Sequence, residues 1–252
     1  MALAGRHAFV TGGGRGIGRA IAAVLARAGA TVTVIGRSEA PLRETVEAGD
    51  AAGCGIADVT DVIEVKREVA AAEAARGPVD ILINNAGSVE SGPFVKADPA
   101  VFRTMWNVHL MGAVYASQAV LPGMIERGFG RIVNIASTAG LKGYAYVSAY
   151  CAAKHALVGL TRALAAETAT RGVTVNAVCP GYTDTELVRD SIDRVATRTG
   201  RPRAELLAEY AKDAPIGRLI TPEEVAAAVL YLCSPGAAAV TGTTLAVAGG
   251  EL

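Results

Sequence analysis

The sequence is short of net charge, cysteine and aromatic side chains. Its 24 lysines and arginines are balanced by 24 aspartates and glutamates, which leaves a formal net charge of +0 at pH 7. A chain without a basic excess lacks the electrostatic footprint of a nucleic-acid-binding protein, and a chain without an acidic run lacks a solvating tail. We therefore expect a small-molecule ligand and no nucleic-acid partner.

The four cysteines stand too far apart for a C-x-x-C pair or for metal-ligand spacing; they are Cys54, Cys151, Cys179 and Cys233. Such isolated thiols are typical of buried cysteines in a cytosolic protein, and no cluster of histidine, cysteine and acidic residues indicates a metal site. The N-terminal MALAGRHAFV lacks the features of a signal peptide, and no apolar run approaches the length of a membrane span. The sequence predicts a soluble cytoplasmic protein with no membrane partner.

Apolar residues are abundant, at 51%, and form short runs that alternate with longer alanine-rich segments of helical period. The short runs are HAFVTG, TVTVIG, VDILINN, GRIVNIAS, VTVNAVCP and the final TGTTLAVAGG. Helices are expected over 17–28, from 39, and over 61–76, 101–127 and 148–170. Nearly continuous apolar strands separated by helices indicate a parallel sheet flanked by helices on both faces. The predicted fold is α/β, a doubly wound Rossmann fold.

No linker, repeat or low-complexity run divides the chain, so we expect a single dinucleotide-binding and catalytic domain over residues 1–252. One stretch, from about 182 to 215, is rich in charge and interrupts the alternation of strands and helices. We interpret it as a substrate-loop insertion.

A glycine-rich turn, T-G-G-G-R-G-I-G, joins the first strand to the first helix. Glycines there allow a tight turn and let a pyrophosphate approach the N-terminus of the helix closely. A glycine cluster alone is weak, but its place between strand and helix favours dinucleotide binding over a plain turn. The loop residues that we expect to bind the cofactor are Gly12, Gly14, Arg15, Gly16, Ile17 and Gly18.

The G-x-x-x-G-x-G spacing of this loop resembles the short-chain dehydrogenase/reductase family, and the likeness covers essentially the whole chain. The resemblance implies further cofactor contacts, at the adenine, along the crevice and at the nicotinamide. In chain order these residues are Asp58, Val59, Asn85, Ala86, Gly87, Pro180, Gly181 and Thr183. Members of the family commonly pair helices between subunits, so a homotetramer or a homodimer is expected.

The end of the second strand bears on the choice between NADP(H) and NAD(H). An acid there would bind the ribose 2′-hydroxyl of NAD, but no acid occurs before Glu39. Arg37 instead offers a forked cation suited to a 2′-phosphate, with Arg15 as a second positive charge. This pattern favours NADP(H). NAD(H) stays open, because Arg37 also suits a solvated helix end and some NAD-dependent relatives carry an arginine here.

Tyr150 and Lys154 form the only Y-x-x-x-K of the chain, and their i, i+4 spacing puts phenol and ammonium on one helix face. A neighbouring ammonium and an oxidised nicotinamide both favour the phenolate, whose pKa is otherwise about 10. In the mechanism that the resemblance implies, Ser137 binds the substrate oxygen, Tyr150 exchanges its proton, and Lys154 holds the nicotinamide ribose. Tyr150 and Lys154 therefore contact the cofactor as well.

The resemblance also assigns Asn107, in the segment W-N-V-H-L-M-G, as the asparagine that completes a proton relay through water to Lys154. Two histidines lie beside these positions in sequence. Because His109 and His155 would each point off the catalytic face of an α-helix, we interpret them as packing or surface residues.

Ser137, Tyr144, Tyr150 and Leu187 are the candidate substrate residues, and they suit a neutral carbonyl or secondary alcohol. The insertion adds four arginines that either bind the phosphates of a coenzyme A or acyl-carrier thioester or form a solvated helix face: Arg194, Arg198, Arg201 and Arg203. The chain is similar to 3-oxoacyl-thioester reductases and 3-hydroxyacyl dehydrogenases.

The favoured function is therefore an NADP(H)-dependent ketoreductase acting on a 3-oxoacyl thioester or a similar ketone. One alternative is an NAD-dependent secondary-alcohol or 3-hydroxyacid dehydrogenase. Another is a non-catalytic dinucleotide-binding regulator, although the full set of Ser137, Tyr150, Lys154 and Asn107 argues against it.

Overall fold

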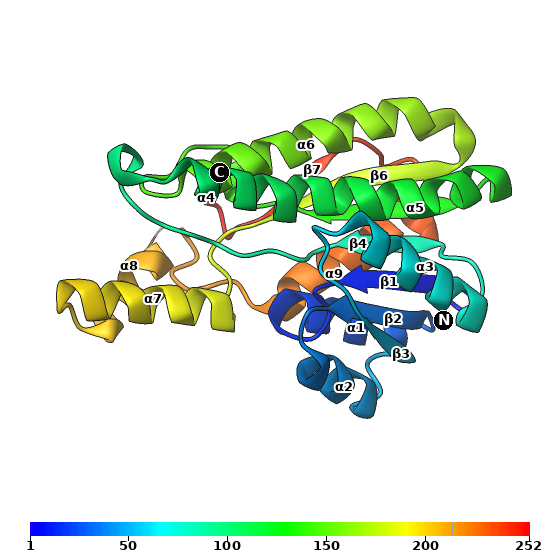
Figure 1. The fold of residues 1–252 in the computed structure, drawn as a ribbon, viewed down its shortest axis with the longest axis horizontal. Coiled ribbons are helices and arrows are strands. Elements are labelled where there is room, and N and C mark those ends of the chain that lie inside the picture. Colours follow the sequence, from blue (N-terminus) through cyan, green and yellow to red (C-terminus); the bar gives the residue numbers. More distant parts are fainter. Residues whose placement is uncertain (213) are drawn as a thin grey trace.

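A seven-stranded parallel sheet organises the chain in a computed structural model that describes residues 1–212 and 214–252 (Figure 1). The strand order is β3-β2-β1-β4-β5-β6-β7, and each neighbouring pair is parallel. The strands are β1 (His7–Thr11), β2 (Thr31–Gly36), β3 (Gly53–Ile56), β4 (Ile81–Asn84), β5 (Gly130–Ile135), β6 (Val173–Pro180) and β7 (Thr244–Val247). The order reverses between β1 and β4, which opens a crevice at their carboxyl ends.

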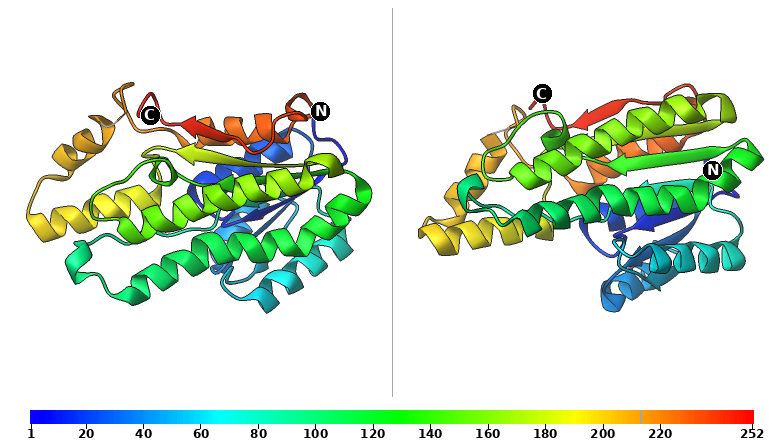
Figure 2. Two further views of the ribbon diagram at one scale, coloured as in Figure 1. Left: turned by 90° about the horizontal axis from the view of Figure 1, so that it is seen from above. Right: turned by 45° about the horizontal axis from the view of Figure 1, so that its top comes forward.

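Helices cover both faces of this sheet (Figures 1 and 2). The helices α1 (Gly16–Arg27) and α9 (Pro222–Cys233) pack on one face, and α3 (Val62–Arg76), α5 (Gly112–Arg127) and α6 (Ser148–Thr168) pack on the other. Strand residues alternate between the two cores, since Phe9 faces the α3 side while Ala8 and Val10 face the α1 side. Both faces are buried, so the strands read as continuous apolar runs. The predicted single-domain, doubly wound fold is confirmed.

Local sequence signals start several helices. Asp61 accepts hydrogen bonds from the N–H groups of Ile63 (2.8 Å) and Glu64 (3.2 Å) and thereby caps α3. The helix α2 (Glu39–Glu47) follows Ser38, and α9 begins at a capping box that Thr221 and Glu224 form.

One helical run is long and apolar enough to cross a membrane by length and composition alone. It comprises α4 (Pro99–Trp106), the π-helical turn η2 (Asn107–Met111) and α5, and 39% of its most apolar window is buried inside the protein. The expectation that no apolar run approaches a membrane span overlooked it. The run lies along the sheet beside α6 (Figure 2), as a core helix of a doubly wound fold does.

The predicted insertion contains two further helices, α7 (Glu186–Thr199) and α8 (Arg203–Lys212). They lie beyond the carboxyl end of the sheet (Figure 1). Position 213, which belongs to the predicted insertion, lies outside the described residues. The role of the insertion as a substrate loop stays a prediction.

The expectation that every cysteine is buried is wrong for Cys54. This residue lies on the edge strand β3 and is exposed, whereas Cys151, Cys179 and Cys233 are buried. An edge strand covers less of its surface than a central strand, and spacing along the chain does not show which strand is at the edge.

Candidate active site

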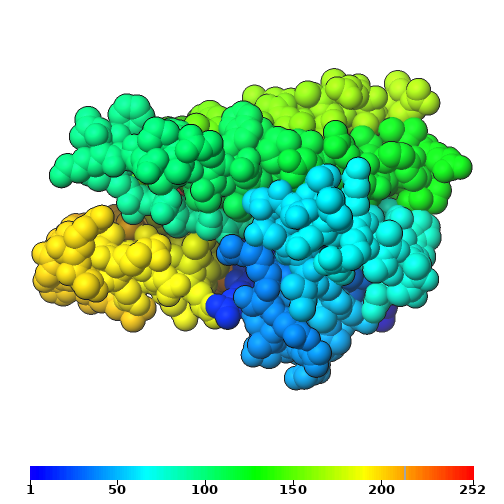
Figure 3. Space-filling view, in the orientation of Figure 1, coloured from blue at the N-terminus to red at the C-terminus, as the bar shows by residue number. Residues whose placement is uncertain are grey.

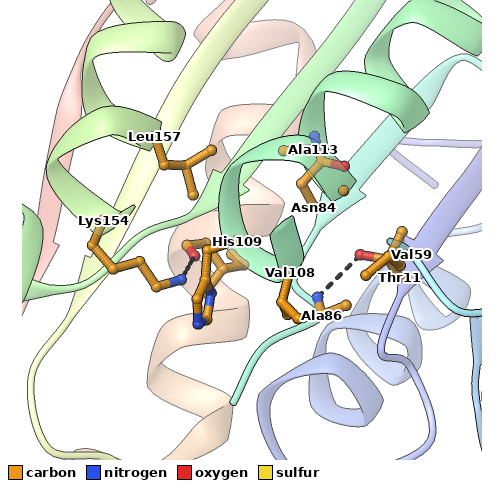
Figure 4. A pocket seen from close by; sticks show the side chains of 11 residues that line it. Thr11, Val59, Asn84, Ala86, Val108, His109, Ala113, Lys154 and Leu157 are labelled. Atoms are coloured by element: carbon orange, nitrogen blue, oxygen red, sulfur yellow. Dashed lines mark hydrogen bonds between the residues drawn. The ribbon is translucent and has the colours of Figure 1, made fainter. Parts of the chain in front are cut away.

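The predicted cofactor motifs meet at the carboxyl ends of β1 and β4. The hydroxyl oxygen of Thr11 accepts hydrogen bonds from the backbone N–H groups of Asn85 (2.9 Å) and Ala86 (3.0 Å, drawn in Figure 4). The side-chain amide of Asn85 donates to the carbonyls of Thr11 (2.9 Å) and Gly12 (3.1 Å). These four bonds tie the N-N-A-G turn to the glycine loop and fix one wall of the crevice.

The glycine loop leaves bare backbone where a side chain would clash. Gly12 and Gly16 have φ values of +66° and +49°, in the left-handed region that favours glycine. A Cβ atom on Gly18, in the first turn of α1, would lie 2.1 Å from the carbonyl oxygen of Gly12. The exposed backbone and the N-terminus of α1 therefore form a surface that fits the pyrophosphate of a dinucleotide.

Helix α7 begins beside this loop. Nη1 of Arg15 lies 3.1 Å from Oε2 of Glu186, and a Cβ on Gly16 would lie 3.2 Å from Cγ2 of Thr185. The hydroxyl of Thr185 caps α7 by accepting a hydrogen bond from the N–H of Val188. In the space-filling view a hollow lies where α7 (yellow) and the N-terminal segment (blue) meet (Figure 3).

The predicted adenosine contacts lie next to each other at the β2 side of the crevice. Oδ1 of Asp58 accepts hydrogen bonds from the N–H (2.9 Å) and the hydroxyl (2.8 Å) of Thr60. Burial raises the pKa of Asp58, but these two bonds and the charge of Arg37 outweigh it, so the pKa is below the ordinary value. Arg37 is exposed at the end of β2, and the buried Val59 lines the catalytic cavity.

The structure brings Ser137, Tyr150 and Lys154 together. Ser137 follows β5, and the interaction of its hydroxyl with the phenol of Tyr150 lowers the pKa of that phenol. Lys154 lies one turn further along α6, with Nζ 5.5 Å from the centroid of the Tyr150 ring. Its Nζ donates a 2.7 Å hydrogen bond to the carbonyl of Ile135, the last residue of β5. The predicted helix face thus points at the end of β5 and into the crevice.

Burial sets the charge state of this pair. It raises the pKa of Tyr150 to about 12, against the lowering effect of the Ser137 hydroxyl, and it lowers the pKa of Lys154 to about 7. The neutral phenol is therefore the resting form, suited to giving a proton to a carbonyl oxygen. Lys154 exchanges its proton close to neutral pH. The i, i+4 spacing indicates the charge of the lysine beside the phenol, but not the burial of the pair, which has the larger effect on both pKa values.

A buried polar network holds α6 at this distance from the sheet. The side-chain amide of Asn84 donates to Oδ1 of Asn134 (2.8 Å), and the Asn134 amide donates to the hydroxyl of Thr161 (2.8 Å). Asn84 ends β4, Asn134 is in β5, and Thr161 is on α6. The chain of bonds runs from strand to strand to helix, so it fixes the depth at which the catalytic helix lies.

The structure places His109, and not Asn107, beside Lys154 (Figure 4). Asn107 opens the turn η2 and is exposed. His109 is 3% exposed and meets the Tyr150 ring edge to face, with 5.1 Å between the ring centroids. The assignment of Asn107 to the Lys154 relay is therefore corrected. His109 is buried, as a packing residue would be, but it faces the catalytic pair.

A buried carboxylate that no sequence motif indicates lies beside Tyr144. The Tyr144 hydroxyl donates its hydrogen to the carboxylate of Glu251, whose side chain is 1% exposed, and its oxygen lies 2.6 Å from the hydroxyl of Thr138, from which it accepts a hydrogen bond. Nζ of Lys142 lies 3.2 Å from that carboxylate. Burial and the bond to Glu251 raise the pKa of Tyr144 above its ordinary value. The substrate candidate Tyr144 is thus anchored through its hydroxyl, and a penultimate residue carries no motif that would reveal this contact.

The remaining predicted residues lie around the same crevice. Pro180 ends β6, and Gly181 follows it beside Ala248, 3.3 Å from where a Cβ on Gly181 would stand. Thr183 is buried and donates its hydroxyl hydrogen to the carbonyl of Gly181 (3.0 Å). In this arrangement the same hydrogen does not point to a cofactor, so the predicted cofactor contact of Thr183 stays a prediction. Leu187 is 41% exposed in the first turn of α7, and its contact with substrate stays a prediction.

The family model described as short chain dehydrogenase matches residues 6–196. A putative ketoacyl reductase of Streptomyces coelicolor is 41% identical over 249 residues, which cover 96% of this chain and 95% of the relative. The 3-oxoacyl-acyl-carrier-protein reductase FabG of Vibrio harveyi is 39% identical over 253 residues, covering 99% of this chain and 98% of the relative.

Solved structures match over nearly the full length. The crystal structure of a variant of actinorhodin polyketide ketoreductase with NADPH superposes with a TM-score of 0.94 at 40% identity, covering 98% of this chain and 97% of that chain. The crystal structure of levodione reductase gives a TM-score of 0.94 at 33% identity, covering 99% and 98% of the two chains.

Proposed function

Because the chain belongs to the short-chain dehydrogenase family, we propose that it is an NADP(H)-dependent ketoreductase acting on a 3-oxoacyl thioester or a similar ketone. The observation that carries the proposal is the grouping of Ser137 and Tyr150, whose hydroxyls interact, with Lys154 one helical turn away. Two neighbouring hydroxyl donors are what a carbonyl oxygen needs as negative charge develops on it.

In this reaction the nicotinamide supplies the hydride to the carbonyl carbon when the cofactor is bound. The residues of the chain handle the oxygen. Ser137 donates a hydrogen bond that orients it, and Tyr150, which is neutral because of its burial, gives it the proton. Lys154, whose pKa is about 7, then returns a proton to the phenolate.

The crevice suits the cofactor from end to end. Gly12, Gly16 and Gly18 leave the backbone cradle that a pyrophosphate fits, and a Cβ on any of the three would lie within 3.2 Å of another residue. Asp58, at the β2 side of the crevice, would hold the adenine, and Lys154, beside the end of β5, would hold the ribose of the nicotinamide. This placement supports the choice of a dinucleotide, and the exposed Arg37 at the end of β2 supports the phosphorylated one. The NADPH in the solved structure of a related ketoreductase is consistent with the same choice.

Replacement of Arg37 by aspartate is expected to reverse the cofactor preference. The lost cation and the added carboxylate should weaken NADPH binding by about 100-fold, through one lost and one repulsive contact with the 2′-phosphate. NADH binding should change by less than about threefold. Paired fluorescence titrations of the wild type and the variant with both cofactors measure this. Equal losses for NADPH and NADH would contradict a role of Arg37 at the 2′-phosphate.

The thioester part of the proposal is supported by two cations that line a second cleft. Lys96 and Arg198 line an open cleft together with Gly92, Pro93 and Tyr146. Two other arginines of the predicted group form ion pairs within the protein. Arg201 pairs with Glu205 and Glu209, and Arg203 pairs with Asp193. Arg198 is therefore the member of the group best placed for a phosphate of coenzyme A or of a phosphopantetheine arm.

The double variant Lys96→Glu, Arg198→Glu is expected to raise KM for acetoacetyl-CoA about tenfold, the effect of losing one charge-assisted contact. KM for ethyl acetoacetate, which has no phosphate, should stay unchanged. NADPH oxidation followed with each substrate gives both values. Arg194→Glu, on the same helix but outside the cleft, is the matched control. An equal rise for both ketones would contradict a phosphate site.

The function as a whole is tested by NADPH oxidation with acetoacetyl-CoA and with ethyl acetoacetate. Turnover of either ketone is the expected result. Reduction of NAD with 3-hydroxybutyrate, in the absence of ketone reduction, would favour the alternative dehydrogenase. Binding of neither cofactor would favour the non-catalytic regulator. We also propose, by analogy with the family, a cytoplasmic location and a homotetramer or homodimer.

A further inference from the structure

A carboxylate that the proposed mechanism does not use is buried beside the loop that follows Ser137. It belongs to Glu251, which lies just after β7 and whose side chain is 1% exposed. The strand β7 ends at the carboxyl edge of the sheet, on the side where α7 and α8 lie (Figure 1). A carboxylate is costly to bury unless it is paired and hydrogen-bonded, so its partners show what it holds.

Two glycines turn the chain so that the carboxylate points inward. Gly249 and Gly250 have φ values of +60° and +89°, which a side chain would strain. The N–H of Glu251 donates to the carbonyl of Ala248 (3.2 Å) and closes the turn. The N–H of Ile216 donates to the carbonyl of Gly249 (3.1 Å) and holds the turn from the other side. The backbone therefore fixes the direction of the carboxylate.

The carboxylate holds the segment 138–146, which we call the catalytic loop, at two points. The hydroxyl of Tyr144 donates to it, and Nζ of Lys142 lies 3.2 Å from its Oε1 and 3.3 Å from the backbone carbonyl oxygen of Glu251. The Tyr144 oxygen in turn accepts a hydrogen bond from Thr138 (2.6 Å), the residue directly after Ser137. The contacts of Glu251 thus extend to the neighbour of a catalytic residue.

The ring of Tyr144 connects this loop to the predicted insertion. It meets the ring of Tyr182 edge to face, with 6.2 Å between the centroids. Tyr182 follows the Pro-Gly turn after β6, and its ring stacks on Tyr210 of α8 at 4.4 Å and 6°. Edge-to-face and stacked rings attract each other. Three tyrosines therefore join the catalytic loop, the end of β6 and α8.

One oxygen of the carboxylate has no donor among the described residues. Oε2 of Glu251 is buried without a hydrogen-bond partner there, and a Cβ on Gly181 would lie 2.8 Å from it. A buried acceptor without a donor destabilises the fold, so stability alone does not explain a carboxylate at this position. The bond to Tyr144 is what the carboxylate supplies.

We propose that Glu251 is a positioning residue for the substrate: its carboxylate holds Tyr144 and thereby fixes the wall of the substrate site that Tyr144 and Tyr182 form. The inference rests on the proposed ketoreduction, in which Glu251 exchanges no proton. A wall that contacts the ketone equally before and during the reaction contributes uniform binding. Loss of the carboxylate should therefore raise KM for the ketone and leave kcat nearly unchanged.

For Glu251→Ala we expect KM for ethyl acetoacetate to rise about tenfold, the effect of losing one charge-assisted hydrogen bond. Both kcat and NADPH affinity should change by less than about threefold. Glu251→Gln keeps an oxygen that accepts the hydrogen of Tyr144, so its KM should stay within about threefold of the wild type. Glu47→Ala, which removes an exposed carboxylate at the end of α2, is the matched control.

A double-mutant cycle shows whether the carboxylate acts through the tyrosine. Tyr144→Phe removes the same hydrogen bond from the other side and keeps the ring, so it should reproduce the rise in KM. Adding Glu251→Ala to Tyr144→Phe should then raise KM by less than about twofold further. Independent effects that multiply in the double variant would overturn the proposal.

Three further results would also overturn it. The first is a wild-type KM in Glu251→Ala. The second is a KM in Glu251→Gln as high as that of Glu251→Ala, because the charge rather than the bond to Tyr144 would then matter. The third is a parallel loss of NADPH affinity in Glu251→Ala, which would place the effect on the cofactor or on the fold as a whole.

A measurement without turnover separates this inference from the proposed function. In hydrogen–deuterium exchange, the backbone amides of 138–146 should exchange faster in Glu251→Ala than in the wild type, and at the wild-type rate in Glu251→Gln. Unchanged exchange in Glu251→Ala would show that the carboxylate does not hold the catalytic loop and would overturn the inference. A wild-type protein that reduces no ketone would overturn the proposed function instead.

Discussion

Tyr150→Phe is expected to lower kcat by about 10³-fold or more while NADPH still binds with an affinity within about threefold of the wild type. The substitution removes the phenol oxygen that gives the proton and leaves the ring in place. The ring packs edge to face against His109 and belongs to a cluster with Met105, Ala149 and Ala153, so the fold should persist. Steady-state ketone reduction and fluorescence titration with NADPH measure the two quantities.

Tyr231→Phe serves as the control for this experiment. Tyr231 lies on α9, on the opposite face of the sheet, and is 49% exposed. It should retain wild-type turnover. Turnover of Tyr150→Phe within about tenfold of the wild type would exclude Tyr150 as the proton donor. Loss of NADPH binding in the variant would mean that the hydroxyl acts on the cofactor rather than on the substrate.

Gly18→Ala is expected to weaken NADPH binding by about 100-fold or more, which corresponds to about 2.7 kcal/mol. The added Cβ would lie 2.1 Å from the carbonyl oxygen of Gly12 and 2.4 Å from Nδ2 of Asn85. The first of these atoms is backbone and the second is held by two hydrogen bonds, so neither moves without opening the loop. The pyrophosphate cradle should therefore lose its shape. Isothermal titration calorimetry with NADPH measures the effect.

Gly14→Ala is the matched control within the same loop. Gly14 does not have a positive φ, and a Cβ there would lie 3.1 Å from its nearest neighbour, the carbonyl carbon of Pro41. A shift of a few tenths of an ångström relieves that contact, so NADPH affinity should fall less than about tenfold. Wild-type NADPH affinity in Gly18→Ala would show that this loop does not hold the pyrophosphate.

The sequence predicted those parts of the site whose residues all lie within a single helix or a single turn. The spacing between Tyr150 and Lys154 implies one helix face wherever the helix lies, because four residues make about one turn. The glycines from Gly12 to Gly18 imply a tight turn from strand to helix, since a turn is a local structure. The structure brings both groups to the crevice at the carboxyl ends of β1 and β4.

The parts that the sequence missed depend on contacts between elements. Glu251 contacts Tyr144 although more than a hundred residues separate them in the sequence. No sequence pattern around Glu251 predicts this contact. Cys54 is exposed because β3 is an edge strand. Burial lowers the pKa of Lys154 to about 7, and the spacing between Tyr150 and Lys154 in the sequence does not show that burial.

The choice between Asn107 and His109 shows the same division. The sequence by itself determined that a helix covers 101–127 and that a parallel sheet lies beneath it, and the resemblance assigned Asn107 to the site. Which residue faces inward was decided by the packing of the π-helical turn η2 over the ends of β1 and β4. A π-turn changes the register of side chains around the helix, so spacing that assumes an α-helix does not carry across it. Only the tertiary structure placed the imidazole of His109 in the wall of the cavity that Lys154 also lines, and left Asn107 exposed.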